Sequence, residues 1–383
     1  MKIVIAPDSF KGSLSSEEAA KAIREGILRA MPTAETVLIP MADGGEGTVD
    51  SLIQATHGSK ISVPVRGPLQ DEVMASYGVL GDGVTCVIEM ASASGLVLIP
   101  AEHRNPLLTT TYGTGQLIRH ALDHGYRSFI LALGGSATND GGSGMLQALG
   151  LQLLDADGRE IGAGGQALSH LKRIDASKWD ERVISESRFI IASDVTNPFI
   201  GPHGASHIFG PQKGATPEMV EALDAALTHF ADLMAAHTGI AVHHLPGAGA
   251  AGGLGGAFQA FFPASTKRGI DVVIEMTKLN EQLQDAQLVI TGEGQTDAQT
   301  ASGKAPMGIA QAASKHGVPV IVLSGSVGQG IEKLYEYGMT SILSIVNGPM
   351  TLQEAMRRTP ELIAQKAEQI MRTFLAGQRM NNG

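Results

Sequence analysis

The sequence predicts an α/β protein with two domains, one of which contains a parallel sheet. The chain has 383 residues, more than a single hydrophobic core usually holds. Apolar residues make up 43% of it, enough to build a sizeable core. Short apolar strands alternate with amphipathic helices near both ends of the chain, which is the pattern of βαβ units and a parallel sheet.

The first sixty residues begin with a βαβ unit. An apolar strand is predicted over residues 3–6, and the next strand over residues 36–41. Between them, Ser15 and Glu18 have the spacing of a capping box at a helix start, and Pro32 ends that helix. These elements predict that the first two strands are parallel neighbours.

The middle of the chain follows a different pattern. Strand-like segments at 63–66, 72–80 and 84–90 have no helix between them, and the turn at 81–83 is typical of a hairpin. We therefore place a domain boundary near residue 60. Further on we predict helices at 115–123 and 217–237, strands at 128–133 and 189–193, and a hairpin that joins 151–154 to 160–161.

The last third returns to strand–helix alternation. Strands are predicted at 288–291, 318–323 and 342–346, and helices at 305–315, 331–337 and 353–375, the last with a break expected before Pro360. We predict that residues 1–60 and 285–383 form one discontinuous domain with a Rossmann- or flavodoxin-like parallel sheet. Residues 61–284 then form an inserted mixed α/β domain.

Composition excludes several functional classes. The net charge of −10 argues against a nucleic-acid or anionic-membrane surface. The single cysteine, Cys86, excludes an intrachain disulfide, and its apolar surroundings predict a buried thiol. The N-terminus does not resemble a signal peptide, and the uncharged run 245–266 is too rich in Gly and Ala to predict a membrane span. We expect a cytoplasmic protein.

The loop of residues 134–142 carries the strongest functional signal. It lies between an apolar strand and a helix start, and contains four glycines with Ser136, Thr138 and Asn139 among them. Such a loop can direct several backbone N–H groups at one anion, so we favour a phosphate site over a simple turn. Asp140 would repel phosphate, and we interpret it as a helix cap, with a Mg²⁺ ligand as the alternative.

Five polar loops follow predicted strands, and open α/β sheets bind ligands at that edge. The loops are residues 8–11, 43–48, 134–142, 194–197 and 292–297. Their carboxylates suit a divalent metal or a proton acceptor, with helix capping as the alternative for each. Capping is least favoured for Asp194, which precedes no helix, and for Glu293, which has glycine on both sides. For Asp43 and Glu46 capping is equally favoured.

Positive charge in Gly/Ser-rich loops comes from Lys11, Lys213 and Lys304, of which Lys11 is the strongest candidate for a ligand contact. Residues 247–252 match the G-x-G-x-x-G pattern, but no strand directly precedes them. We therefore favour a close backbone approach to nucleotide or a closely packed helix over a nicotinamide site. The sequence contains no P-loop, protein-kinase or nucleophile-elbow motif.

Seven ordered blocks resemble the signatures of the type-1 glycerate kinase family, from one end of the chain to the other. They are residues 7–13, 42–48, 134–142, 193–198, 209–214, 246–253 and 291–297. The resemblance implies two α/β domains with the active site in the cleft, and ATP-dependent phosphorylation of D-glycerate with Mg²⁺. For bacterial members it implies 2-phosphoglycerate as the product, in glyoxylate and aldarate breakdown, with the 3-phospho product as the alternative.

With that resemblance, the loops suggest a set of roles. The predicted catalytic residues are Asp194 and Lys11, and the predicted substrate ligands are Asp8, Ser9, Phe10, Lys11 and Asn197. The predicted phosphate or nucleotide ligands are Gly134, Gly135, Ser136, Asn139, Gly249, Gly252 and Lys213. The predicted metal ligands are Asp194, Glu293 and Asp297.

Two other functions remain as alternatives from the residues alone. One is a nicotinamide-dependent hydroxy-acid dehydrogenase that uses residues 247–252, and the other is a non-catalytic binding protein for small acids. The expected partners are D-glycerate and ATP, without nucleic acid or membrane. The sequence does not decide the oligomeric state, for which a homodimer is one option, or whether O2 or O3 is phosphorylated.

Overall fold

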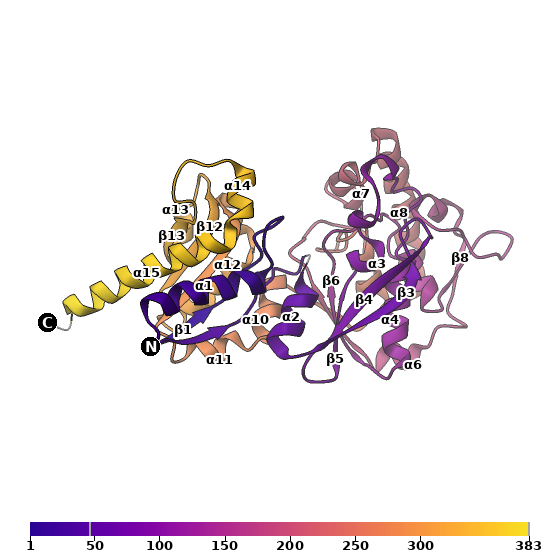
Figure 1. The fold of residues 1–383 in the computed structure, drawn as a ribbon. Helices are drawn as coiled ribbons and strands as arrows, with labels where there is room; N and C mark the ends of the chain where they lie inside the picture. Colours follow the sequence, from indigo (N-terminus) through magenta and orange to yellow (C-terminus); the bar gives the residue numbers. More distant parts are fainter. Residues whose placement is uncertain (46, 382–383) are drawn as a thin grey trace. The chain divides into compact units, whose positions relative to one another are not determined.

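The computed structural model describes residues 1–45 and 47–381, which form two compact units (Figure 1). Unit 1 comprises Met1–Asp43, Asp50–Thr56 and Ile270–Gly383, and unit 2 comprises Gly44–Val49 and His57–Gly269. We predicted boundaries at 60/61 and 284/285. Residues 270–284 belong with unit 1, where the side chain of Ile270 packs so closely on Gly308 that a Cβ at position 308 would have no room. That each unit folds as an independent domain stays a prediction.

Unit 1 contains a five-stranded parallel sheet with the order β13-β12-β11-β1-β2. Its strands are β1 (Lys2–Ile5), β2 (Glu35–Leu38), β11 (Leu288–Thr296), β12 (Val320–Val327) and β13 (Met339–Ser344). The two ends of the chain meet where β1 pairs with β11, with Ile3 opposite Leu288. This confirms the predicted parallel sheet built from N- and C-terminal segments.

Two long helices, α1 (Ser16–Ala30) and α15 (Thr359–Asn381), lie side by side in unit 1, drawn in indigo and yellow in Figure 1. Their close contact depends on Gly26, where a Cβ would collide with the carbonyl of Ala364. The predicted capping box of Ser15 begins α1, and the break before Pro360 separates α14 from α15. The other helices assigned here are α2 (Thr48–Thr56), α10 (Gly269–Met276), α11 (Leu279–Leu283), η5 (Ala298–Ser302), α12 (Ala305–Ser314), α13 (Glu332–Glu336) and α14 (Leu352–Arg357).

One strand of unit 1 is longer than predicted. We expected a strand at 288–291 and a loop at 292–297, but β11 stays paired with β12 through Thr296. Glycine allows the continuation, because a Cβ at Gly292 would lie 2.5 Å from the carbonyl oxygen of Leu323. Glycines that interrupt the apolar pattern of a strand therefore concealed its true length.

Unit 2 contains a six-stranded mixed sheet with the order β10-β9-β6-β5-β4-β3. Its strands are β3 (Ser59–Arg66), β4 (Glu72–Val79), β5 (Thr85–Glu89), β6 (Ser128–Ala132), β9 (Arg188–Ala192) and β10 (Ala264–Lys267). The strands β3, β4 and β5 pair antiparallel, and β5 also begins the parallel part, which continues through β6, β9 and β10. This confirms the predicted mixed α/β architecture. Cys86 is buried in β5, and burial raises the pKa of its thiol to about 12, as expected for a structural cysteine.

The predicted hairpin at 151–161 forms, but it is short. An antiparallel bridge joins Leu154 to Glu160, the N–H of Ile161 donates to the carbonyl of Leu153 at 2.8 Å, and the N–H of Asp155 donates to the carbonyl of Arg159 at 2.8 Å. The strand β7 (Gln152–Leu154) also pairs with β8 (Arg173–Asp175), which we did not predict. The segment after the turn is too short before the glycines at 162, 164 and 165 to form a strand of its own.

The helices of unit 2 cover its sheet and connect its strands. They are α3 (Ala91–Ser94), η1 (Leu96–Leu98), η2 (Ala101–His103), α4 (Tyr112–Asp123), α5 (Ser143–Ala148), η3 (Gly165–His170), α6 (Glu181–Ser185), α7 (Ala205–Phe209), η4 (Pro211–Lys213), α8 (Pro217–Thr238) and α9 (Leu254–Phe261). Among the described residues, no helix has the length and apolar character needed to cross a membrane.

Candidate active-site residues

Each unit carries some of the predicted loops at the carboxyl ends of its parallel strands. In unit 1, residues 8–11 follow β1 and lie beside the middle of β11, because the N–H of Asp8 donates to the carbonyl of Gly292 at 2.8 Å. In unit 2, residues 134–142 follow β6 and residues 194–197 follow β9. The loop at 43–48 divides between the units after Asp43, and Glu46 lies outside the described residues.

Asp8 is a half-buried carboxylate with unfavourable electrostatics. Burial raises the pKa of Asp8 to about 7, and repulsion from Asp43 and then Glu293 adds to the effect. A hydrogen bond of 2.6 Å from the N–H of Ser9 to Asp8 Oδ1 opposes it. Of its predicted partners in substrate binding, Ser9 is half-buried and Lys11 is exposed, whereas Phe10 is buried in the hydrophobic core.

We predict that Asp8→Asn stabilises unit 1 at pH 8 but not near pH 4. The raised pKa means that folded Asp8 holds its proton up to about pH 7, whereas an unfolded aspartate loses it near pH 3.8. The stability that protonated Asp8 contributes is therefore full below pH 3.8 and is lost as the pH rises towards 7. Thermal melting of the wild type and Asp8→Asn from pH 4 to 8 measures the difference in Tm between them. If the Tm advantage of Asp8→Asn shrank as the pH rose, the prediction would be contradicted.

Glu293 lies almost fully buried in β11 and is tightly held within unit 1. Its Oε1 accepts hydrogen bonds from the hydroxyls of Thr296 at 2.9 Å and Thr300 at 2.8 Å. Its Oε2 lies 3.3 Å from Nζ of Lys304. Burial raises the pKa of Glu293, and the Lys304 ammonium opposes this rise. The Glu293 carboxylate is thus bound by two hydroxyls and one ammonium, so little of its hydrogen-bonding capacity remains for an external ligand.

Asp297 caps a short helix. Its Oδ1 accepts from the N–H of Gln299 at 2.8 Å at the start of η5, and its Oδ2 accepts from the Gln295 amide at 2.8 Å. Among the described residues, no group of three or more His, Cys, Asp and Glu side chains is arranged to hold a metal ion. Metal binding by Asp194, Glu293 and Asp297 therefore stays a prediction.

The carboxyl edge of the unit 2 sheet brings three predicted residues to the surface. Ala132 of β6 pairs with Ala192 of β9, so the residues two positions later, Gly134 and Asp194, leave adjacent strands at the same edge. Gly134, Gly135 and Asp194 are all exposed. No helix begins within the few residues after Asp194, so capping does not explain this carboxylate.

Beyond Gly135 the loop turns into the protein. Thr138, Asn139 and Asp140 have no exposed surface. Asp140 Oδ2 accepts from the N–H and hydroxyl of Thr111 at 2.8 and 2.9 Å and from Gly144 N–H at 3.3 Å, and Oδ1 accepts from Gly142 N–H at 3.0 Å. These bonds confirm the capping interpretation of Asp140 at the start of α5. Burial raises the pKa of Asp140, and the hydrogen bonds oppose this rise.

Lys213 supports this loop from inside the unit. It is only 1% exposed, and its ammonium donates to Ser136 Oγ at 2.9 Å and to the carbonyl of Thr138 at 2.7 Å. Burial lowers the pKa of Lys213 to about 7, against the attraction of Asp140. Asn139 donates to Ser206 Oγ at 2.9 Å, while Asn139 Oδ1 and Thr138 Oγ1 are buried without a hydrogen-bond partner.

The glycine-rich segment 247–253 packs against the same loop. Gly252 lies so close to Thr138 that a Cβ would collide with its carbonyl oxygen, and Gly249 approaches the carbonyl of Pro198 in the same way. No strand directly precedes the segment, so it lacks the context of a dinucleotide fingerprint. Close packing accounts for Gly249 and Gly252, and nucleotide contact by either stays a prediction. Asn197, a predicted substrate ligand, donates its amide to the carbonyl of His203 at 2.9 Å.

Sequence reasoning missed two features beside the loop. Thr109, Thr110 and Thr111 are buried, and the last two donate to Asp140. A run of three hydroxyl residues directly before α4 was a usable signal for such a cluster. The other feature is Arg104, which no local pattern distinguished from a surface arginine.

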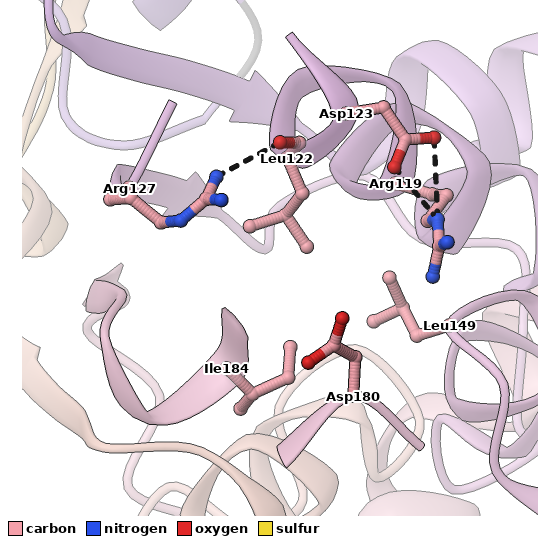
Figure 2. A pocket seen from close by; sticks show the side chains of 7 residues that line it. All are labelled: Arg119, Leu122, Asp123, Arg127, Leu149, Asp180 and Ile184. Carbon is pink, nitrogen blue, oxygen red and sulfur yellow. Dashed lines mark hydrogen bonds and ion pairs between the residues drawn. The ribbon is translucent and has the colours of Figure 1, made fainter. Parts of the chain in front are cut away.

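A separate cavity of about 250 Å³ lies near the amino ends of β6 and β9 in unit 2, away from these loops (Figure 2). Its arginines are already paired: Arg119 with Asp123 at 3.0 Å, and Arg127 with the carbonyl of Leu122 at 2.9 Å. The apolar part of its wall comes from Leu122, Leu149 and Ile184. None of the predicted site residues lines this cavity.

Comparison with known proteins gives one consistent result. Residues 3–375 match the glycerate kinase family. A glycerate kinase from Halalkalibacterium halodurans is 51% identical, with 96% of this chain and 97% of that protein covered. The Escherichia coli K12 glycerate 2-kinase is 48% identical, with 99% of each chain covered. A crystal structure from Salmonella typhimurium LT2, provisionally assigned as glycerate kinase 2, superposes with a TM-score of 0.89 at 48% identity over 99% of both chains. The chain therefore belongs to the glycerate kinase family.

Proposed function

We propose that the protein transfers the γ-phosphoryl group of ATP to the 2-hydroxyl of D-glycerate, with Mg²⁺, and releases ADP and 2-phospho-D-glycerate. The relative from E. coli, which matches over 99% of each chain, carries the name glycerate 2-kinase. The observation that carries the proposal is the edge of the unit 2 sheet. There the exposed backbone of Gly134 and Gly135 continues into a loop that Lys213 holds from within.

The loop supplies what phosphoryl transfer needs from a protein, which is positioning and charge compensation more than covalent chemistry. Glycines at 134 and 135 let a phosphate approach the backbone closely, since neither has a side chain to block it. The Lys213 ammonium orients Ser136 Oγ and adds positive potential behind the loop. Asn139 has no exposed surface, so we propose that it positions the loop by its bond to Ser206.

In the reaction, the substrate hydroxyl oxygen forms a bond to the γ-phosphorus while the bond to the bridging β–γ oxygen breaks. The hydroxyl proton passes to Asp194, the exposed carboxylate that follows β9 next to Gly134. Binding of the glycerate carboxylate by Ser9 and Lys11 stays a prediction. Within unit 1, Asp8 and Asp43 repel each other, and their carboxylate oxygens are ligands that Mg²⁺ prefers, so a cation would relieve that repulsion.

The test is a product analysis. Incubation with MgATP and D-glycerate is expected to release ADP in proportion to a new phosphomonoester. Proton-coupled phosphorus NMR separates the regioisomers, because phosphorus at O2 couples to one proton and phosphorus at O3 couples to two. L-Glycerate and D-lactate are the matched controls. If glycerate did not raise the rate of ADP release, the proposed kinase activity would be contradicted. If the phosphorus signal of the product were a triplet, the product would be reassigned as 3-phosphoglycerate.

The same experiment separates the two alternatives drawn from the sequence. A hydroxy-acid dehydrogenase would reduce NAD with glycerate, which absorbance at 340 nm detects, and a binding protein would be stabilised by glycerate without consuming ATP. Neither has a specific structural observation in its favour, since residues 247–253 pack against protein backbone. A role in glyoxylate and aldarate breakdown accompanies the kinase proposal, because glycerate is the substrate that such breakdown would supply.

A further inference from the structure

The segment of residues 94–110 runs along the loop of unit 2 and contacts it at both ends. At one end, Leu96 N–H donates to the carbonyl of Gly135 at 2.9 Å, and Ala137 N–H donates to the carbonyl of Ser94 at 2.9 Å. At the other end, Thr109 Oγ1 donates to the carbonyl of Ala137 at 2.8 Å. The segment is therefore fixed to the same few residues of the loop on which the proposed phosphate contacts depend.

Arg104 lies in the middle of this segment, next to the residue that follows Lys213. Gly214 has a φ of +93°, and a Cβ at that position would lie 2.5 Å from the carbonyl oxygen of Arg104 and 3.0 Å from its Cβ. Lys213 in turn donates to Ser136 and Thr138 of the loop. The backbone of Arg104 is thus held against the turn that positions the buried lysine.

Arg104 combines partial burial with a guanidinium that has no partner among the described residues. The residue is half-buried, and its Nε is fully buried without a hydrogen-bond partner. Across residues 1–45 and 47–381, the side chain forms no hydrogen bond or ion pair. Six other arginines of unit 2 have partners: Arg66 stacks on Tyr112, Arg119 pairs with Asp123, Arg127 donates to Leu122, Arg159 pairs with Asp157, Arg173 with Asp175 and Arg182 with Glu186. Arg188 also lacks a partner among the described residues, but it is exposed to solvent, whereas the Nε of Arg104 is buried.

Partial burial of a charge without a partner costs free energy, so such a residue is normally paired. The planar fork of a guanidinium matches the two oxygens of a carboxylate or phosphate, which a bound reactant would supply. A half-buried cation without a protein partner, in a segment that is hydrogen-bonded to the loop, is suited to binding an anionic ligand.

We propose that Arg104 binds an oxyanion of the reactants beside the loop of residues 134–142, either a phosphate of the nucleotide or the carboxylate of glycerate. The inference rests on the proposed phosphoryl transfer for the identity of these two ligands. It adds a cationic ligand to a site whose other cation, Lys213, is committed to Ser136 and Thr138 of the protein itself.

The test compares Arg104→Gln and Arg104→Lys with wild type. Arg188→Gln is the matched control, because Arg188 is exposed and begins β9 at the opposite end of the sheet from the loop. Calorimetry measures the Kd of ATP and of D-glycerate separately, and steady-state kinetics gives KM for each. Loss of a charged, forked hydrogen bond is expected to weaken one of the two ligands by about 10- to 100-fold in Arg104→Gln. Arg104→Lys should be intermediate, since an ammonium keeps the charge but not the fork.

The ligand that weakens identifies the oxyanion. A change confined to ATP and its KM assigns Arg104 to phosphate, and a change confined to D-glycerate assigns it to the carboxylate. Wild-type affinity for both ligands in Arg104→Gln overturns the inference, and if that variant does not fold, the Arg104→Lys values decide. Wild-type protein that binds ATP but forms no ADP with glycerate contradicts the proposed function alone, because the binding comparison still tests Arg104. Wild-type protein that binds neither ligand overturns both.

Discussion

Asp194→Asn is expected to lower the turnover of the proposed reaction by about 10²–10⁴-fold, the usual contribution of a general base. Asparagine has nearly the same shape but neither accepts the substrate proton nor carries negative charge. Asp194 is the exposed carboxylate that leaves β9 beside Gly134, and no helix close behind it requires a cap. ATP binding should be retained, because the loop of residues 134–142 and Lys213 are unchanged.

The matched control is Asp157→Asn, an exposed aspartate in the turn after β7 that should leave turnover unchanged. Two measurements distinguish the roles considered for Asp194. If it accepts the proton, the acidic limb of the pH–rate profile should disappear in Asp194→Asn. If it binds Mg²⁺, the Mg²⁺ concentration for half-maximal activity should rise instead. Turnover near the wild-type value would rule out both roles.

Asp140→Ala is expected to destabilise unit 2 by about 3–5 kcal/mol. The substitution leaves the N–H groups of Thr111 and Gly142 and the hydroxyl of Thr111 buried without an acceptor, and each such group costs about 1–3 kcal/mol. Water does not replace the carboxylate readily, since Asp140 has no exposed surface. Urea denaturation followed by the fluorescence of Trp179, the only tryptophan in the chain, reports on unit 2 directly.

Asp155→Ala is the control for this prediction. Asp155 also accepts two backbone N–H bonds, from Asp157 and Arg159 at 2.9 Å each, but in a turn that solvent reaches. Water can therefore satisfy both donors after the substitution, and we expect a loss below about 1 kcal/mol. If Asp140→Ala were no more destabilising than Asp155→Ala, its hydrogen bonds would not hold the loop as described.

Local sequence patterns predicted well those features that depend on neighbouring residues. The capping box of Ser15 and Glu18, the break before Pro360 and the capping role of Asp140 each involve groups only a few residues apart. The parallel sheet of unit 1 followed from strand–helix alternation, because a short connection through a helix restricts how two strands can pair.

The failures occurred where a distant partner decides the outcome. The strand β11 extends to Thr296 because β12 pairs with it, although its own residues resemble a polar loop. The strand at 152–154 also pairs with residues 173–175, which the spacing did not indicate. In both cases long-range hydrogen bonding added strand pairing that local propensity does not reveal.

The same contrast applies to the candidate site. The sequence by itself determined the fold class, the loops at the strand ends and a family resemblance that the comparisons confirmed. Only the tertiary structure decided which polar residues are accessible. Gly134, Gly135 and Asp194 reach the surface, whereas Asn139 and Lys213 are enclosed. It also showed that Arg104, whose Nε is buried, has no side-chain partner within residues 1–45 and 47–381. Exposure and charge pairing depend on every chain segment that packs around a side chain, and neighbouring residues in the sequence specify only a few of these.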